Sequence, residues 1–355
     1  FYLWADEEIN ALLGADGPIV REYYGMVAGG NFEGRSILHV PRDLDAAAAA
    51  AGVRPDRLRD ALARARPVLY HARATRVWPA RDEKILASWN GLMLRAMAEG
   101  ARAFASRRYR ELAVANGEFL FREMVKDDRV LRSHKAGTTR VAGYLEDQAA
   151  VALGALALYD LTFERRWLDR ARALGDAMVR WYWDDSAGAF FDTATDHEPL
   201  ITRPREVTDN ATPSGTSLAV ELSLRLATLF DDDAHRRRAE RALAALADGM
   251  GRMPLAFGHL LVAADLAVRG ATELAIVGDP ETEEFQALVA VAAHRFVPAL
   301  VQVGGRSDQN ADVPLLADRT APAGPAAYLC RHYVCQMPAP DPTTLAAQLD
   351  AAVAR

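Results

Sequence analysis

The sequence contains few cysteines, few lysines and no long uninterrupted apolar run. Two cysteines among 355 residues cannot form a disulfide framework. Charges or glycines interrupt every apolar stretch well before about 18 residues, so we expect no membrane-spanning segment. No block of lysine and arginine stands out, and the formal net charge is −6. A general nucleic-acid-binding surface is therefore not expected either.

Motifs for metals and nucleotides are also missing. None of the eight histidines has an H-E-x-x-H or similar ligand spacing, and neither a P-loop nor a G-x-G-x-x-G pattern is present. Cys330 and Cys335 are an odd number of positions apart, so on one strand they would face opposite sides, which disfavours a redox pair or a zinc site. We expect no metal and no cofactor.

The composition is that of a globular protein, because half of the residues are hydrophobic and a quarter are charged. The first residues do not read as a signal peptide, so we expect a cytoplasmic protein. The chain opens at Phe1 on a strand-like segment without an initiator methionine, which suggests a part of something longer. Only Lys84, Lys126 and Lys135 are lysines among 42 basic residues, so a lysine within a motif draws some notice.

Buried and amphipathic helices alternate along the chain. Three helix-length segments are apolar around most of their circumference, which predicts helices enclosed by protein: 85–105, 143–163 and 214–230. Each is followed by a segment with a polar face: 109–125, 166–183 and 234–250. A loose repeat of two helices per unit predicts an array of helical hairpins, and inner helices that are this enclosed favour a closed α/α toroid over an open solenoid.

The connections between these helices differ in length. Turns from an inner to an outer helix are short, whereas residues 129–142 and 184–213, which return to an inner helix, are long and contain strand-like pieces. If the inner helices run in the same direction, all long loops lie at one mouth of the toroid. Functional residues concentrate on such loops, so this mouth is the predicted site.

The C-terminal part departs from the helical repeat. Residues 274–277, 299–303 and 326–335 read as strands and 283–294 as a helix. We therefore predict two domains, a toroid portion over 1–270 and a small α/β appendage over 271–355 that packs on it.

Several polar residues near the predicted inner-helix starts are candidates for chemistry. Glu146 and Asp147 are either helix-capping residues or a carboxylate pair for acid–base work on a glycosidic bond, with Glu33 or Asp209 as a further partner. Trp89 and Asn90 suit a sugar ring and its hydroxyls, and Lys84 suits a developing negative charge; a core tryptophan beside a salt-bridged lysine is the other interpretation.

The segment 209–217 enters the third buried helix. Ser214 after Pro213 is a good helix N-cap, and Gly215 leaves room for a neighbour or a ligand, so both capping and binding remain open. His134 and His259 are either acid–base groups or structural histidines.

The order of the motifs along the chain resembles that of a known family. The residues that carry the resemblance are Phe1-Tyr2-Leu3-Trp4, Gly30-Asn31-Phe32-Glu33-Gly34, Asp82-Glu83-Lys84-Ile85-Leu86, Trp89-Asn90-Gly91, Leu145-Glu146-Asp147, Arg166-Trp167-Leu168, Pro213-Ser214-Gly215 and Tyr328-Leu329-Cys330. Together they resemble the YyaL-type, thioredoxin-domain-containing family that includes spermatogenesis-associated relatives. The resemblance covers essentially the whole chain and adds Asn31 and Glu33 to the candidate substrate-binding residues. Members usually begin with a thioredoxin-like domain and the first toroid hairpins, which this sequence does not contain.

The resemblance implies an (α/α)6 toroid of the six-hairpin glycosidase type, incomplete at its N-terminus. By analogy with epimerases and glycosidases of that fold, it implies a sugar hydrolase or epimerase with a carbohydrate or other small polar ligand. The alternative is a non-catalytic interaction scaffold that works with a thioredoxin-like domain or a protein client. Neither nucleic acid nor a membrane is an expected partner.

Overall fold

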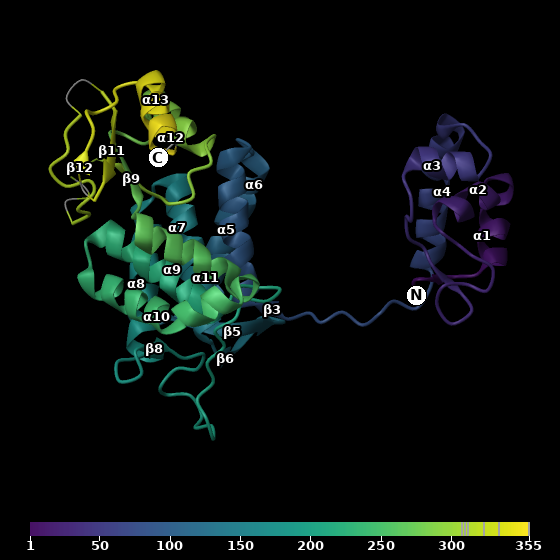
Figure 1. Cartoon of the computed structure of the whole chain (residues 1–355), viewed down its shortest axis with the longest axis horizontal. Helices are drawn as coiled ribbons and strands as arrows, with labels where there is room; N and C mark the ends of the chain where they lie inside the picture. The colour runs from purple at the N-terminus through teal and green to yellow at the C-terminus, as the bar shows by residue number, and fades with distance from the viewer. Residues whose placement is uncertain (307, 309, 311, 322–323, 333, 354–355) are drawn as a thin grey trace. The chain divides into compact units, whose positions relative to one another are not determined.

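The computed structural model describes residues 1–306, 308, 310, 312–321, 324–332 and 334–353. The chain separates into two compact units, Phe1–Glu83 and Lys84–Arg355 (Figure 1). The predicted domain boundary at residue 270 stays a prediction. No helix of the described residues is long and apolar enough to cross a membrane.

The first unit is a small helical assembly. Its elements are β1 (Leu3–Trp4), α1 (Asp6–Leu13), the 3-10 turn η1 (Gly14–Asp16), α2 (Gly17–Tyr23), β2 (Ser36–Ile37), α3 (Leu44–Ala50) and α4 (Pro55–Ala74). Along α4, Leu58, Leu62, Ala65 and Leu69 recur at three- and four-residue spacing and are buried in the core of this unit. The short strand is confirmed for its last two residues, whereas α3 and α4 were not predicted.

The second unit contains the alternating helices that the sequence predicts. The inner row consists of α5 (Ala87–Ala103), α7 (Leu145–Thr162), α9 (Gly215–Phe230) and α11 (Gly258–Arg269). The outer row consists of α6 (Arg107–Phe119), α8 (Arg165–Tyr182) and α10 (Asp233–Arg252). Helices α5, α7 and α9 each pack on the next inner helix and on the outer helix that follows. The mainly α-helical class and the paired inner and outer helices of an (α/α) toroid are confirmed.

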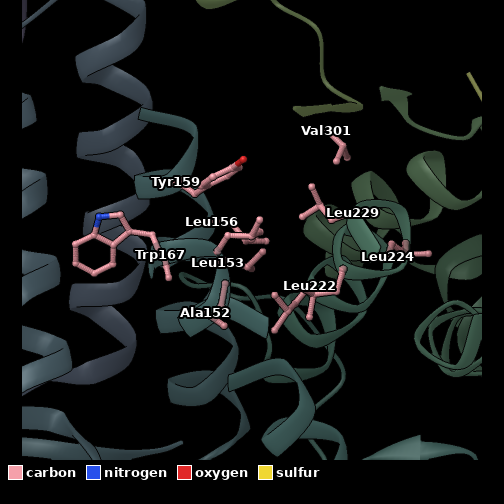
Figure 2. Close-up of a cluster of buried hydrophobic side chains, with 14 of the residues drawn as sticks. Ala152, Leu153, Leu156, Tyr159, Trp167, Leu222, Leu224, Leu229 and Val301 are labelled. Atoms are coloured by element: carbon pink, nitrogen blue, oxygen red, sulfur yellow. The ribbon is translucent and has the colours of Figure 1, made fainter. Parts of the chain in front are cut away.

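Burial follows the prediction in two of the inner helices but not in the first. Helices α7 and α9 are enclosed along most of their length. Figure 2 shows their side chains meeting in the core, with Trp167 and Val301 added from α8 and β10. The prediction that α5 is enclosed is wrong, because Trp89 and Met93 are 64% and 51% exposed. Helices α6 and α7, which pack on α5, leave this face open.

Two glycines allow α5 and α7 to approach closely. A Cβ atom on Gly91 would lie 2.6 Å from the carbonyl carbon of Ala150, and one on Gly154 would lie 3.1 Å from the Gly91 oxygen. Any side chain at Gly91 would therefore collide with the backbone of α7. This contact fixes the distance between the first two inner helices.

Short strands and long loops gather at one end of the second unit (Figure 1). The strands are β3 (Ile85–Leu86), β4 (Val125–Lys126), β5 (Arg129–Lys135), β6 (Thr138–Ala142), β7 (Trp183–Asp184) and β8 (Ala189–Phe190). A π turn, η2 (Leu120–Met124), links α6 to β4, and a 3-10 turn, η3 (Pro254–Phe257), precedes α11. The long returning connections lie at this end, as predicted.

A mixed sheet occupies the opposite end of the second unit (Figure 1). Its strand order is β10-β9-β11-β12, with β9 (Thr272–Val277), β10 (Leu300–Gly305), β11 (Ala326–Arg331) and β12 (Val334–Cys335). Helices α12 (Glu283–Ala293) and α13 (Pro342–Val353) belong to this part; α13 was not predicted. The α/β appendage is thus confirmed.

The sheet corrects one expectation about the cysteines. Residues 326–335 form two antiparallel strands rather than one, with Cys330 opposite Cys335. The two residues form a disulfide. The argument that they face opposite sides is wrong, because the chain reverses between them.

Candidate functional site

The N-termini of α5 and α7 are joined by one buried carboxylate. Asp147 is fully buried; its Oδ1 accepts from the backbone N–H of Ser88 at 2.9 Å, and its Oδ2 accepts from the N–H of Tyr144 at 2.9 Å and from Nη1 of Arg132 at 2.9 Å. Burial raises the pKa of Asp147 against these hydrogen bonds. The capping interpretation of Asp147 is therefore confirmed, and all of these contacts are within the protein.

A second carboxylate joins the start of α9 to that of α11. Oδ2 of Asp209 accepts from the N–H groups of His259 at 2.8 Å and Leu260 at 3.1 Å, and Oδ1 accepts from the N–H of Ser214 at 2.9 Å. Gly215 lies so close to α7 that a Cβ there would be 3.0 Å from the Glu146 nitrogen. The four inner helices thus begin at one common rim, as the loop lengths predict.

A cavity of about 400 Å³ opens at this rim between the starts of α7 and α9 and the loop 191–214. Three carboxylates line it: Glu146, Asp192 and Glu206. Its other polar groups include the hydroxyls of Thr208 and Ser214. No lysine or arginine belongs to the described lining. We call this space the rim cavity.

Glu146 is the predicted candidate that remains accessible at the rim cavity. Its side chain is 34% exposed, and Oε1 accepts from Nη1 of Arg132 at 2.8 Å. The same Nη1 donates to Asp147, and the Arg132 guanidinium lies 4.6 Å from the Tyr144 ring centre. Arg132 therefore orients the Glu146 side chain, and the same guanidinium also pairs with the buried capping residue Asp147.

Asp192 and Glu206 have opposite electrostatic surroundings. Burial raises the pKa of Asp192, and the nearby charges of Glu206 and Glu146 raise it further, although the Glu206 N–H donates to Oδ2 of Asp192 at 2.7 Å. The pKa of Glu206 is lowered, because the hydroxyl and the N–H of Thr208 donate to Oε1 at 2.5 and 2.9 Å. A pair of carboxyl groups with diverging pKa values is the usual equipment for acid and base roles in one site.

The remaining predicted residues of the second unit lie at the rim but outside the cavity lining. Ser214 is the exception: it lines the cavity and caps α9 by accepting from the N–H of Ser217 at 3.1 Å. Asn90 donates to the Leu86 carbonyl at 2.9 Å, Trp89 is largely exposed on α5, and Lys84 precedes β3.

Asn31 and Glu33 belong to the first unit, whereas the rim cavity is formed by the second. The Asn31 amide accepts from the Ile37 N–H at 2.8 Å and donates to the Ile37 carbonyl at 3.0 Å. Glu33 has a positive φ of 47° within the same turn. Both residues therefore shape a local turn, and their roles in binding stay predictions.

A group of charges lies deeper along the inner helices, and we call it the inner charge cluster: Arg95, Glu221, Arg225 and His259. Glu221 is almost completely buried, and its Oε2 accepts from Arg95 at 2.8 Å and lies 2.9 Å from His259 Nε2, while Oε1 accepts from Arg225 at 2.7 Å. Burial alone would raise the pKa of Glu221, but the charges of Arg225 and Arg95 outweigh it and hold the pKa well below its usual range. The cluster ties α5, α9 and α11 together.

Comparisons with known proteins find relatives that match nearly the whole of this chain. The chain is 27% identical over 381 residues to human spermatogenesis-associated protein 20, a match that covers 97% of this chain and 48% of the relative. An uncharacterized protein of Caenorhabditis elegans is 25% identical over 365 residues, covering 95% of this chain and 50% of that protein. The chain thus spans about half the length of the curated relatives that it matches. No protein-family model matches it.

Solved structures of helical carbohydrate enzymes are similar over part of the chain. A family 76 glycoside hydrolase from a bovine Bacteroides thetaiotaomicron strain matches with a TM-score of 0.41 and 13% identity, covering 78% of this chain and 58% of that one. Cellobiose 2-epimerase from Bacillus thermoamylovorans matches with a TM-score of 0.40 and 15% identity, covering 48% and 45%.

Sequence reasoning missed Asp192, Glu206 and Arg132, and it missed every member of the inner charge cluster except His259. Asp192 and Glu206 lie inside a long loop without periodic signal, so only their position on the predicted mouth could have drawn attention to them. Glu221 and Arg225 were visible as two charges, four residues apart, in an otherwise uncharged helix. Such charges must be paired when buried, and this was the signal that was available.

Proposed function

We propose that the rim cavity binds a carbohydrate and that its carboxyl groups perform acid–base chemistry on it, as in a sugar hydrolase or epimerase. The observation that carries this proposal is the pair Asp192 and Glu206, whose pKa values are shifted in opposite directions at one cavity. Asp192, whose pKa is raised, would act as the acid, and Glu206, whose pKa is lowered, as the base. Glu146 would accept hydrogen bonds from sugar hydroxyls.

The lining supports a neutral polyhydroxylated ligand. The carboxylates and hydroxyls provide acceptors and donors, and no described lining residue carries a positive charge that would select an anion. Tyr144 and Leu200 add apolar surface for the C–H face of a ring. The volume lies within the range of about 300–1,000 Å³ that is usual for small-molecule sites.

We also propose that the chain belongs to the YyaL-type, thioredoxin-domain-containing family and that a thioredoxin-like domain is its partner. The 27% identity to spermatogenesis-associated protein 20 over nearly the whole chain supports this assignment. Under this proposal the protein acts in the cytoplasm.

The test combines binding and turnover in three proteins. Wild type, Asp192→Asn and the control Glu198→Gln, which removes one exposed charge from the same loop outside the cavity lining, are titrated calorimetrically with mono- and disaccharides. Ligands that bind are then assayed for hydrolysis by reducing-sugar release and for epimerisation by proton NMR in D2O. We expect Asp192→Asn to lower turnover by about 10²–10⁴-fold, the usual contribution of a general acid, and Glu198→Gln to leave it unchanged.

Two results would contradict the proposal. If no sugar binds to the wild type and none raises its melting temperature, the carbohydrate assignment is wrong. The non-catalytic scaffold is then favoured. If sugars bind and turn over but Asp192→Asn matches the wild type, the assigned acid is wrong.

A further inference from the structure

The first unit contains a cavity of its own, which we call the α4 cavity. It measures about 520 Å³, and its wall is aromatic and aliphatic, with Trp4, Tyr24, Leu69 and Tyr70 among its members. Its basic members are Arg66, His71 and Arg73, and no aspartate or glutamate belongs to the described lining. The charge is thus the reverse of that in the rim cavity.

The two arginines of the α4 cavity differ from arginines close to them in the sequence. Arg64, on α4, pairs with Asp16 at 2.9 Å, and Arg76, two residues after the end of α4, pairs with Glu8 at 2.5 Å. Within the part of the chain that the structure describes, Arg66 and Arg73 have no carboxylate partner, and the Arg66 side chain donates to the Tyr24 hydroxyl at 3.5 Å. Two guanidinium groups without a carboxylate partner among the described residues therefore line the same cavity.

Aromatic rings surround one of these guanidinium groups. The Arg73 guanidinium carbon lies 5.5 Å from the ring centre of Phe1, 5.6 Å from that of Tyr2 and 5.7 Å from that of Tyr70. Rings interact with the face of a guanidinium and leave its N–H edges available, and these edges form the fork that binds a carboxylate with two parallel hydrogen bonds. The contacts restrict the side chain before any ligand arrives.

We propose that the α4 cavity binds a small organic anion in which a carboxylate is attached to a flat apolar ring. The carboxylate pairs with Arg73 and Arg66, and the ring packs between Tyr24, Tyr70 and Leu69. A neutral sugar has no group that would use both cations, and an inorganic anion would leave the aromatic wall uncovered. This site is independent of the function proposed for the rim cavity.

The probe pair for the test is indole-3-acetate and its neutral analogue indole-3-acetamide, which have the same ring and differ in charge. Both are titrated into the full chain by isothermal calorimetry, with ligand-observed NMR for weak binding. We expect one site for the acetate with at least about tenfold higher affinity than for the acetamide, because a charge-assisted bidentate pair forms only with the anion. Phenylacetate serves as a second, smaller anion.

Three variants show whether the arginines of the α4 cavity are responsible. Arg73→Gln and Arg66→Gln should each weaken acetate binding by about tenfold or more and leave acetamide binding unchanged. Arg59→Gln, on the same helix but exposed and already paired with Asp56, is the matched control and should bind like the wild type. Thermal melts of all variants show that the fold is retained.

The proposal is overturned by any of three outcomes. These are equal affinity for the acetate and the acetamide, a loss in Arg59→Gln as large as that in Arg73→Gln, or no binding of either anion at millimolar concentration.

Discussion

Replacing Glu221 by glutamine removes the negative charge at the centre of the inner charge cluster while keeping the size of the side chain. In the wild type, this carboxylate accepts from Arg95 and Arg225 and contacts His259, and it is buried between three inner helices. The amide can accept at one atom only, and its NH2 group points a donor at groups that are themselves donors. Two guanidinium groups then remain without their common anion.

The expected loss of stability follows from what each arginine retains. Breaking a buried ion pair by removing one partner costs about 3–5 kcal/mol. Arg95 keeps Glu99 as a partner at 2.8 Å, and Arg225 keeps the Leu300 carbonyl at 3.2 Å, so we expect the lower end, about 3 kcal/mol. For a domain of this size, that corresponds to a fall in melting temperature of roughly 6–12 °C.

Urea titrations and thermal melts followed by circular dichroism measure this loss. The matched control is Glu99→Gln, which also removes a partner of Arg95 but is 56% exposed and should cost less than about 1 kcal/mol. Because the pKa of Glu221 is lowered in the folded state, its stabilising effect is present above the unfolded value of about 4.5 and is lost as the pH falls through the folded value. The difference in free energy of unfolding between the wild type and Glu221→Gln should therefore become smaller at acid pH.

A loss in Glu221→Gln no greater than that in Glu99→Gln at pH 7 would refute the reasoning. If the difference in free energy of unfolding between the wild type and Glu221→Gln stays constant from pH 7 to acid pH, the explanation by the charge of Glu221 is refuted. The double variant Glu221→Gln with Arg225→Met should recover part of the stability, because it also removes one of the unpaired cations.

Two further predictions concern α5 and α7. Gly91→Ala should lower the free energy of unfolding by about 3 kcal/mol or more, since its Cβ would meet the backbone of α7. Gly251→Ala, where a Cβ has open space, should be neutral or stabilise the fold by up to about 1 kcal/mol. Equal urea midpoints for the two variants would contradict this. Burial raises the pKa of Asp160 to about 6 despite the charge of Arg102. Asp160 should therefore destabilise the fold increasingly as the pH rises from about 4 to 6, and Asp160→Asn should flatten this part of the stability profile; parallel profiles of the two proteins would contradict it.

The helices of the second unit could be predicted because the pattern of apolar residues along a segment indicates how much of the helix is buried. Helices α7 and α9 are apolar around most of their circumference, and a helix enclosed by protein is the structure that such a segment stabilises. The same argument gave a wrong prediction for α5, because the sequence pattern shows which residues are apolar but not whether another helix or loop packs on them. Trp89 is apolar and exposed.

The location of the candidate site was predicted, but only some of its residues were. Loop lengths located the rim, and Glu146 and Ser214 line its cavity. Asp192 and Glu206 come together only because the loop folds back on itself, and no local pattern encodes that path. For the same reason, the reversal of the chain between Cys330 and Cys335 could not be read from their spacing.

The loop 191–214 contains no helix or strand, yet it is fastened to the helices at both ends of the rim cavity. The Leu145 N–H donates to the Asp192 carbonyl at 2.9 Å, and the Asp209 N–H donates to the Ala256 carbonyl at 2.7 Å. Within the loop, the Asp192 N–H donates to the Pro204 carbonyl at 3.0 Å. A ligand entering the cavity would meet walls that folding has already immobilised, so little backbone entropy would be lost on association. Affinity at such a preorganised pocket depends mainly on how well the ligand's shape and hydrogen-bonding groups match it.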